Sequence, residues 1–348
     1  MVISKTPFRV SFFGGGTDYP VWYRNHGGEV LATTIDKYCY ISCRYLPPFF
    51  EHKHRIVYSK IENVKDTSEI EHPAVRATLE YMGIKEGLEI HHDADLPART
   101  GLGSSSAFTV GMLHAGYALK GIMLEKTSLA SCAIHIEQNI LKENVGSQDQ
   151  IMATYGGFKR VIFNEDDTFN VRHVIVKKQR LKELESHLML YFTGFSRYAS
   201  EIAKKQIEET DKRKRELSIM HQMVDEAVNI LAENRDVVEF GKLLNESWKL
   251  KRSLTDKIST PKIDEIYEAA ISAGAVGGKL LGAGGGGFML VFARHEDQPS
   301  VEERLKHLLR VPFKFENEGS QIIVYQPQST DLKSMKPYET LGVGTGKS

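Results

Sequence analysis

Hydrophobic and polar positions alternate at the start of the chain and predict a strand over residues 1–13. Phe8, Val10 and Phe12 recur at every second position, which is the period of a strand. Short hydrophobic runs predict further strands over 30–46, 88–90, 161–163, 171–176 and 189–192. Helical spacing predicts helices over 72–82, 105–120 and 124–141. The first half therefore mixes strands and helices.

The second half opens with a helical pattern that extends from residue 200 to 233. Ile219, Met223 and Ala227 follow the 3.6-residue period of one helix face. The charged portion, 204–216, is interpreted as a solvent-exposed face rather than a nucleic-acid patch. Further helices are expected over 237–253, 262–273 and 301–309, and further strands over 288–292 and 321–325.

A polar stretch in the middle of the chain predicts a domain boundary. Residues 177–182 read Lys-Lys-Gln-Arg-Leu-Lys and separate two strand-rich blocks. A domain averages about 150 residues, so this length favours two domains. We expect one domain over 1–180 and a second over 181–348, with an irregular tail from residue 329.

Composition narrows the class of protein. The 348 residues carry 45 Lys+Arg and 45 Asp+Glu, and zero net charge argues against broad binding to nucleic acid or to an anionic membrane. We find no signal-peptide pattern and no run of about 18 hydrophobic residues that would span a membrane. Cys39 and Cys43 share one face of an expected strand, which favours buried thiols over a metal site. A cytoplasmic enzyme is expected.

A glycine- and serine-rich segment before an expected helix is a candidate phosphate site. Residues 97–107 read Pro-Ala-Arg-Thr-Gly-Leu-Gly-Ser-Ser-Ser-Ala. Glycines let backbone N–H groups turn towards a ligand, and the positive end of the helix dipole favours an anion. A capped turn without a ligand is the alternative, and this segment alone does not decide between them.

Two further glycine-rich clusters favour a phosphate site over a capped turn without a ligand. Residues 279–287, Lys-Leu-Leu-Gly-Ala-Gly-Gly-Gly-Gly, lead into an expected strand, which suggests backbone packed tightly against something; a flexible hinge is the alternative. Near the N-terminus, Arg9 and Asp18 lie on either side of a Gly-Gly-Gly turn. By contrast, the ending Gly342-Val-Gly-Thr-Gly-Lys-Ser has one residue too few for a P-loop, so we interpret it as a flexible tail.

Spacing alone does not decide the roles of two acidic residues. Glu137 lies in an expected helix with hydrophobic neighbours, and Asp149 follows twelve residues later in a polar loop. Without further information, Glu137 is most simply an exposed helix residue.

Together, the three segments resemble the three signature motifs of the GHMP kinase superfamily, in the right order and at the right separation. Within it the chain resembles the D-glycero-D-manno-heptose 7-phosphate kinases. That finer resemblance depends on stretches such as Tyr58-Ser-Lys, His72-Pro-Ala-Val-Arg-Ala, Gly146-Ser-Gln-Asp-Gln-Ile and Trp248-Lys-Leu-Lys-Arg-Ser-Leu. Related sugar 1-kinases share several of them.

The resemblance implies roles for individual residues. Asp149 would accept the proton of the sugar hydroxyl, and Arg9 would stabilise developing negative charge. Ser105 and Glu137 would bind Mg²⁺, and ATP would be the co-substrate. The loop expected to bind the ATP phosphates comprises Gly101, Leu102, Gly103, Ser104, Ser105 and Ser106. The third-motif loop comprises Gly282, Gly284, Gly285 and Gly286, and it would close against the nucleotide loop.

For the sugar, the resemblance implies contacts from Asp18, together with Gly15, Gly16 and Thr17. Galactokinases have Glu-His where this chain has Gly15-Gly16. The loss of two side chains opens space for a longer sugar. A 7-phosphate would need basic partners, for which Arg99, Arg197 and Arg252 are candidates, beside Lys204 and Lys249.

The implied fold is α+β in two domains: a ribosomal-protein-S5-like N-terminal domain and a ferredoxin-like C-terminal sandwich. The implied activity is a heptose 7-phosphate 1-kinase of nucleotide-heptose synthesis. One alternative is a 1-kinase for another sugar, such as fucose or galacturonate. Another is a non-catalytic sugar- or nucleotide-sensing protein, which we disfavour because Arg9, Glu137 and Asp149 are all present. The expected partners are small molecules, and a homodimer is compatible with this interpretation.

Overall fold

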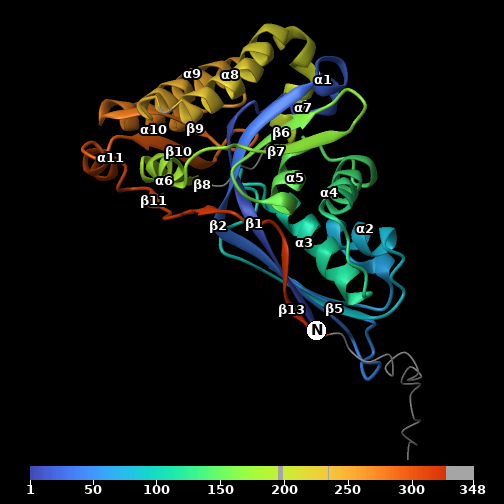
Figure 1. The fold of residues 1–348 in the computed structure, drawn as a ribbon. Coiled ribbons are helices and arrows are strands. Elements are labelled where there is room, and N and C mark those ends of the chain that lie inside the picture. Colours follow the sequence, from blue (N-terminus) through green and yellow to red (C-terminus); the bar gives the residue numbers. More distant parts are fainter. Residues whose placement is uncertain (195–198, 234, 327–348) are drawn as a thin grey trace, which may run out of the picture.

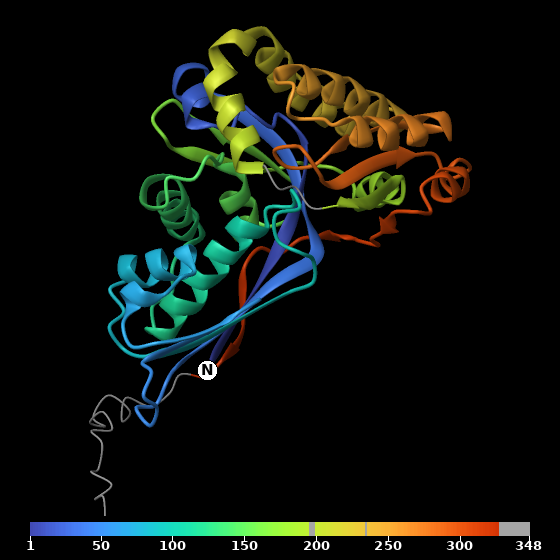
Figure 2. The same cartoon turned by 180° about the vertical axis from the view of Figure 1, so that it is seen from behind.

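Two β-sheets, each covered by helices, make up the computed structural model, which describes residues 1–194, 199–233 and 235–326 (Figures 1 and 2). The larger sheet has nine strands, with the order β13-β1-β2-β5-β3-β4 and with β6, β7 and β12 joined through β2. Its strands are β1 (Val2–Phe13), β2 (Gly28–Tyr45), β3 (His54–Val57), β4 (Ile61–Val64), β5 (Leu88–Ala94), β6 (Lys159–Phe163), β7 (Phe169–His173), β12 (Phe315–Glu316) and β13 (Gln321–Tyr325).

Helix α3 (Ser104–Leu119) fills the core over this sheet. Its hydrophobic residues are buried on almost all sides because it packs on β1 and β2 below and against its neighbouring helices above. Gly111 permits a close approach to β1, since a Cβ there would lie 2.9 Å from Thr6 Oγ1. The neighbouring elements are α2 (Pro73–Tyr81), α4 (Lys126–His135), a π-helical turn (Ile136–Ile140) and α5 (Gln148–Tyr155). Helix α1 (Pro20–His26) and a 3₁₀ turn (Thr67–Glu69) complete this half.

The smaller sheet is antiparallel, with the order β11-β8-β10-β9. Its strands are β8 (Leu188–Gly194), β9 (Ala275–Leu280), β10 (Gly287–Ala293) and β11 (Leu309–Arg310). In chain order this is 4-1-3-2 with helices in the two crossovers, which is the βαββαβ pattern of a ferredoxin-like sandwich. The helices are α6 (Lys178–Ser186), α7 (Ala199–Glu209), α8 (Lys214–Ala232), α9 (Val238–Leu254), α10 (Pro261–Ser272) and α11 (Gln298–Arg304).

Some local expectations are wrong in informative ways. The single helix expected over 200–233 is divided by a 3₁₀ turn, Thr210–Arg213, into α7 and α8. The polar stretch interpreted as a break, residues 177–182, falls largely within helix α6, which buries Leu184 together with Arg180 and exposes most of its other charged side chains. Hydrophobic spacing alone does not show either feature, because a charged helix lacks a continuous hydrophobic face.

The expectation of buried thiols is confirmed. Cys39 and Cys43 lie on β2, are free and are fully buried. Burial raises the pKa of Cys43 to about 12. Within the described ranges, no group of three or more His, Cys, Asp or Glu residues could hold a metal ion.

The end of the described chain returns to the first sheet. Strand β12 pairs with β2, and β13 pairs with β1 along its outer edge. Ser320 lies just before β13, where its hydroxyl is 2.8 Å from Thr6 Oγ1 and 2.9 Å from His114 Nδ1. The division into 1–180 and 181–348 stays a prediction, and the tail from 329 lies outside the described residues.

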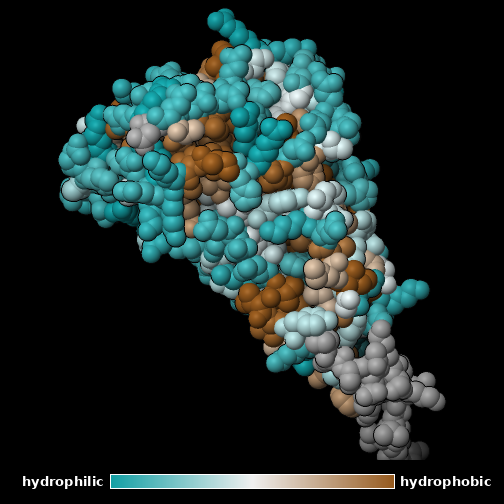
Figure 3. Space-filling model, in the orientation of Figure 1, coloured by the Kyte–Doolittle hydropathy of each residue, from teal (hydrophilic) through white to brown (hydrophobic). Residues whose placement is uncertain are grey.

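The surface drawn in Figure 3 is mostly hydrophilic, with separate hydrophobic patches. One patch lies over β13, where Ile323 and Tyr325 are exposed. Of the helices described, none combines the length and hydrophobicity that a membrane crossing requires.

Candidate active site

Arg9 and Asp149 form a partly buried ion pair between β1 and α5. Arg9 lies on β1, and Asp149 lies in the first turn of α5. Arg9 Nε donates to Asp149 Oδ1 at 2.7 Å and Nη2 donates to Oδ2 at 2.8 Å. This two-pronged arrangement fixes the orientation of both groups. The side chain of Asp149 is 25% exposed against 5% for Arg9, so the carboxylate is the member that a ligand can reach.

The glycine- and serine-rich loop lies directly against this pair. Arg9 Nη1 donates to Gly101 O at 2.8 Å, and Arg9 N donates to Leu102 O at 3.0 Å. Gly103, with φ 75°, is the N-cap of α3. A Cβ on Gly103 would lie 3.3 Å from Asp149 Oδ2. The positive end of α3 and its first N–H groups therefore open beside Asp149, an arrangement suited to phosphate.

The third glycine-rich loop, between β9 and β10, packs on the start of the phosphate loop. A Cβ on Gly282 would lie 2.4 Å from Gly101 Cα, and one on Gly287 would lie 2.3 Å from Thr100 O. Phe288 N donates to Thr100 O at 3.1 Å. The glycines are therefore needed for close approach, which argues against the alternative of a flexible hinge.

The rest of this loop is anchored to the segment that precedes α10. Gly285 N donates to Ile258 O at 2.9 Å, and a Cβ on Gly284 would lie 2.7 Å from the same oxygen. Gly286 has φ 150°. This backbone contact holds the loop in place from its outer side.

Glu137 is buried, so its interpretation as an exposed helix residue is wrong. It lies in the π-helical turn, and such turns are frequent at functional sites. Ser106 Oγ donates to Glu137 Oε2 at 2.8 Å, and Gln150 Nε2 donates to the same oxygen. Glu137 Oε1 has no hydrogen-bond partner among the described residues. Burial raises the pKa of Glu137 to about 7.

These features of Glu137 fit a bound divalent cation. A buried carboxylate oxygen without a donor is costly, and a cation would satisfy it. Mg²⁺ favours oxygen ligands and binds through one or two carboxylates plus substrate phosphates. Ser105 is exposed on the first turn of α3, whereas Ser106 is the hydroxyl that contacts Glu137. The assignment of Ser105 as a Mg²⁺ ligand stays a prediction.

Asp18 lies close enough to the Arg9–Asp149 pair for both charges to act on it. Gly16 N donates to its Oδ1 at 2.9 Å, and Gln148 Nε2 donates to its Oδ2 at 3.2 Å. A Cβ on Gly146 would lie 1.9 Å from Oδ2, so only glycine fits there. Burial raises the pKa of Asp18.

The neighbours of Asp18 in the turn differ in accessibility. The Thr17 hydroxyl is fully buried and donates to Gly14 O at 2.7 Å, so it anchors the turn. Gly15 is only partly buried, and the nearest atoms to a Cβ there would be Ser11 Oγ at 3.7 Å and Gln148 Nε2 at 3.9 Å. The structure therefore leaves room beside Gly15 but not beside Gly16, where a Cβ would lie 3.0 Å from Leu217 Cδ2.

The arginines expected to bind a distal phosphate are dispersed. Arg99 is exposed in the phosphate loop with φ 61°. Arg252 Nη2 lies 3.3 Å from Asp264 Oδ1. Arg197 lies outside the described residues. Their role stays a prediction.

Sequence reasoning missed several polar residues of the site. Gln148 and Gln150 flank Asp149 and bind the two other carboxylates, and this alternation was a signal that the sequence carried. Ser106 follows the expected Ser105 by one residue. Lys251 and Lys279 are both buried. Both lie in stretches that carried the resemblance, but nothing in the sequence distinguishes them from exposed lysines such as Lys249.

Comparisons with known proteins agree with this geometry. The chain matches the family models of the GHMP kinases N terminal domain over residues 69–157 and of the GHMP kinases C terminal over 226–310. It is 31% identical over 345 residues to the D-glycero-alpha-D-manno-heptose 7-phosphate kinase of Campylobacter jejuni, covering 91% of this chain and 97% of that protein. A bifunctional fucokinase/GDP-fucose pyrophosphorylase of Arabidopsis thaliana is 26% identical, covering 87% of this chain and 31% of that protein.

A solved structure extends the similarity to the fold. The D-glycero-D-manno-heptose 1-phosphate kinase of Bacteroides thetaiotaomicron has a TM-score of 0.75 at 25% identity, covering 94% of this chain and all of that one. The expected α+β fold is confirmed. The chain belongs to the GHMP kinases, and it is a sugar kinase that transfers a phosphoryl group to an alcohol, with ATP as co-substrate.

Proposed function

We propose that this kinase phosphorylates O1 of D-glycero-α-D-manno-heptose 7-phosphate and forms the 1,7-bisphosphate for nucleotide-heptose biosynthesis. The observation that carries the chemistry is the Arg9–Asp149 pair directly beside Gly103 of the phosphate loop. The similarity to the Campylobacter jejuni enzyme supports the choice of substrate.

The proposed step is a direct transfer. The O1 oxygen attacks the γ-phosphorus of ATP, a new O–P bond forms, and the bond from that phosphorus to the β–γ bridging oxygen breaks, so that ADP leaves. Asp149 accepts the O1 proton or orients the hydroxyl. Arg9 remains protonated and favours the negative charge that develops at the attacking oxygen and the phosphoryl group.

A magnesium ion fits the same scheme. Glu137, through its unpartnered oxygen, and a serine hydroxyl of the first turn of α3 would hold it. When bound, Mg²⁺ neutralises phosphate charge. The neighbouring Gln150 and Ser106 orient the Glu137 carboxylate by donating to its other oxygen.

Asp18 and the open turn support a sugar that is longer than a hexose. The Asp18 carboxylate would accept hydrogen bonds from sugar hydroxyls, and Gly15 leaves space beside it. The fucokinase similarity keeps a 1-kinase for an unphosphorylated sugar as the second candidate.

A panel of sugars separates the candidates. We expect ATP consumption with heptose 7-phosphate and ³¹P NMR of the product showing phosphate at C1. Turnover with fucose, galacturonate or another free sugar, and none with heptose 7-phosphate, would overturn the proposed substrate.

Substitution of the proposed base tests the mechanism. Asp149→Asn should lower kcat by a factor of about 10² or more while the affinity for ATP stays nearly unchanged. Turnover close to that of the wild type would remove Asp149 from the mechanism.

A further inference from the structure

Two buried lysines lie between α9 and β9, next to the site, and the proposed chemistry does not use them. Lys251 on α9 is 8% exposed and Lys279 on β9 is 3% exposed. Among the described residues, no carboxylate forms an ion pair with either ammonium group, whereas Arg9 nearby is paired with Asp149. Buried charges in proteins are normally paired or hold a ligand.

The contacts of Lys251 place it at the third glycine-rich loop. Its Nζ donates to Leu280 O at 2.9 Å and to Gly282 O at 2.5 Å. Gly282 is in turn packed on Gly101 of the phosphate loop. An ammonium group has three N–H donors, so one donor of Lys251 is uncommitted among the described contacts.

The contact of Lys279 places it at the turn that carries Asp18. Its Nζ donates to Phe12 O at 2.7 Å, at the end of β1 and just before the Gly14–Gly16 turn. Two of its donors are uncommitted among the described contacts. The charges of Arg9 and Asp18 act on both lysines, and the charge of Lys251 acts on Lys279. Lys279 therefore contacts the segment that leads into the turn carrying Asp18, while Lys251 contacts the loop that packs on Gly101.

The charge balance of this region favours an anion. With both lysines protonated, Arg9, Lys251 and Lys279 would place three cations against the two carboxylates of Asp18 and Asp149, so a bound anion is what would let both lysines keep their protons. Burial lowers the pKa of Lys251 to about 7, and burial together with Lys251 lowers that of Lys279 well below its ordinary value. A phosphate dianion between the two ammonium groups would remove the repulsion and occupy the uncommitted donors.

We propose that Lys251 and Lys279 bind the distal phosphate of the sugar substrate, an inference that rests on the proposed function. The arginines singled out from the sequence would then not be the main ligands of this group. The terminal phosphate of ATP is the other phosphate present in the reaction. The contact of Lys279 with the segment that leads into the turn carrying Asp18 favours the sugar phosphate.

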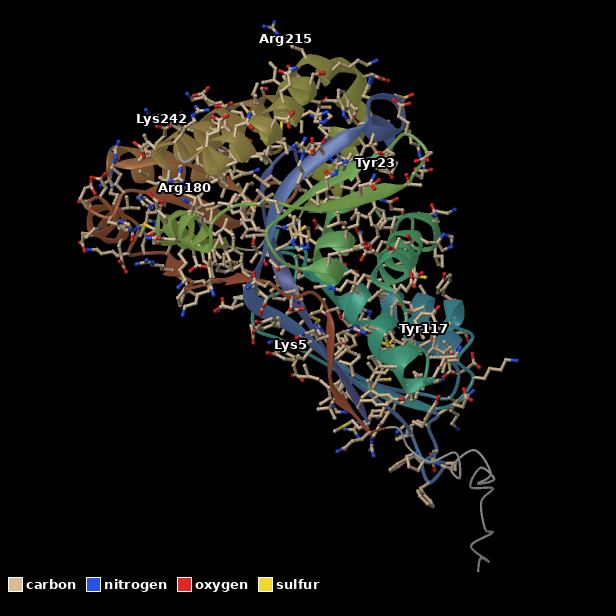
Figure 4. The ribbon with its side chains drawn as sticks, in the orientation of Figure 1. Lys5, Tyr23, Tyr117, Arg180, Arg215 and Lys242 are labelled. Carbon is tan, nitrogen blue, oxygen red and sulfur yellow. The ribbon has the colours of Figure 1, made fainter. Side chains whose placement is uncertain are left out.

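Steady-state kinetics with two acceptors test the proposal. Lys251→Met and Lys279→Met are compared with Lys242→Met, which removes an exposed charge on the outer side of α9 (Figure 4). Each is assayed with heptose 7-phosphate and with unphosphorylated heptose. We expect the two buried-site variants to raise KM for heptose 7-phosphate about tenfold or more, the loss of one charge-assisted hydrogen bond. KM for ATP and the constants for free heptose should change much less than KM for heptose 7-phosphate, and Lys242→Met should leave all of them within about twofold. Lys279→Met carries the comparison, because Lys251→Met also removes the hydrogen bonds to Leu280 O and Gly282 O in the third glycine-rich loop.

Three kinetic outcomes would overturn the proposal. They are unchanged constants in both variants, a rise in KM for ATP alone, and an equal loss with phosphorylated and free heptose. The second would assign the lysines to the terminal phosphate of ATP, and the third would make them structural supports of the loop.

A binding measurement is used where the variants turn over too slowly for kinetics. It also separates this proposal from the proposed function. Inorganic phosphate should raise the melting temperature of the wild type more than that of either buried-site variant, because phosphate bound at α3 persists in all of them. Equal rises would count against the lysine site. If the wild type does not phosphorylate heptose 7-phosphate yet shows the lysine-dependent rise, the proposed substrate fails and the phosphate site stands.

Discussion

At the scale of single residues, the two oxygens of Glu137 have different tasks. Oε2 is held by Ser106 and Gln150, while Oε1 has no partner among the described residues. Glu137→Gln removes the charge but keeps the shape. We expect it to raise the Mg²⁺ concentration needed for half-maximal rate, because a neutral amide is a poorer ligand for a hard cation. Initial rates of the wild type and the variant over a range of Mg²⁺ concentrations measure this value. If the two proteins need the same Mg²⁺ concentration, Glu137 has a structural role and is not a ligand.

The neighbouring serines provide a matched pair. Ser106→Ala leaves a buried carboxylate with one donor fewer, so we expect it to lower the free energy of unfolding by about 1–3 kcal/mol. Ser105→Ala removes an exposed hydroxyl, so it should leave stability unchanged and raise the Mg²⁺ requirement. Urea unfolding and Mg²⁺ titration of both variants decide between the two serines. A raised Mg²⁺ requirement in Ser106→Ala, and an unchanged one in Ser105→Ala, would show that Ser106 is the ligand.

Burial of Lys251 should also make the unfolding free energy depend on pH. Its pKa is about 7 in the folded chain because of burial and about 10.5 when unfolded. The folded state thus binds fewer protons between these values, so the wild type gains stability as pH rises from 7 to 10.5. Lys251→Met lacks this gain. We expect the unfolding free energy of the wild type, relative to that of the variant, to decrease as pH falls from 10.5 to 7 and to stay constant below pH 7. Urea unfolding of both proteins at several pH values measures this difference, and a difference that does not depend on pH would contradict the burial of the charge.

At the scale of elements, the contact between the two glycine-rich loops sets the position of the phosphate loop. Gly282→Ala would place a Cβ 2.4 Å from Gly101 Cα, and it would also strain a residue with φ 74°. Gly121→Ala is the control, because Gly121 has φ 73° with no atom within 4 Å of a Cβ. Both variants should lose about 1 kcal/mol of stability from backbone strain. Only Gly282→Ala should also lower kcat/KM, by about tenfold or more, and equal activity in the two would show that the contact is dispensable.

The elements also show how far sequence patterns can predict this fold. The hydrophobic patterns predict the ranges of strands β1, β10 and β13 and of helices α2, α3 and α10 closely. Strand β9 gave no such pattern because it contains Gly277 and Gly278, and glycine is required there by tertiary packing. A Cβ on Gly277 would lie 2.1 Å from Gly241 O on α9. The period of a strand does not report a neighbour that is far away in the sequence.

The same limit applies to the site. The resemblance to the GHMP kinases singled out Arg9, Asp149 and the phosphate loop, and the structure brings these three together. The burial of Glu137 depends on a π-helical turn and on α5, and Lys251 depends on how α9 packs on the third loop. Such contacts join residues far apart along the chain, so spacing does not reveal them.

At the scale of the whole molecule, the last strands connect the two ends of the chain. Strands β12 and β13 belong to the nine-stranded sheet although they follow the smaller sheet in sequence. A Cβ on Gly156, at the end of α5, would lie 2.0 Å from Glu318 C, so the returning segment packs against the helix that carries Asp149. The nine-stranded sheet therefore includes residues from beyond position 310.

This topology predicts the behaviour of a fragment cut at the expected boundary. Residues 1–180 alone lack β13, which covers the edge of β1 and pairs with Ser4 and Lys5. They also lose the buried contacts of Ser320 with Thr6 and His114. We expect this fragment to unfold at a lower temperature than the same fragment with residues 312–326 appended through a glycine–serine linker. Circular dichroism melting of both gives the comparison, and a version with Ser320→Val in the appended strand is the control, which should recover only part of the gain. Equal melting of all three fragments would show that residues 1–180 form a domain without the returning strands.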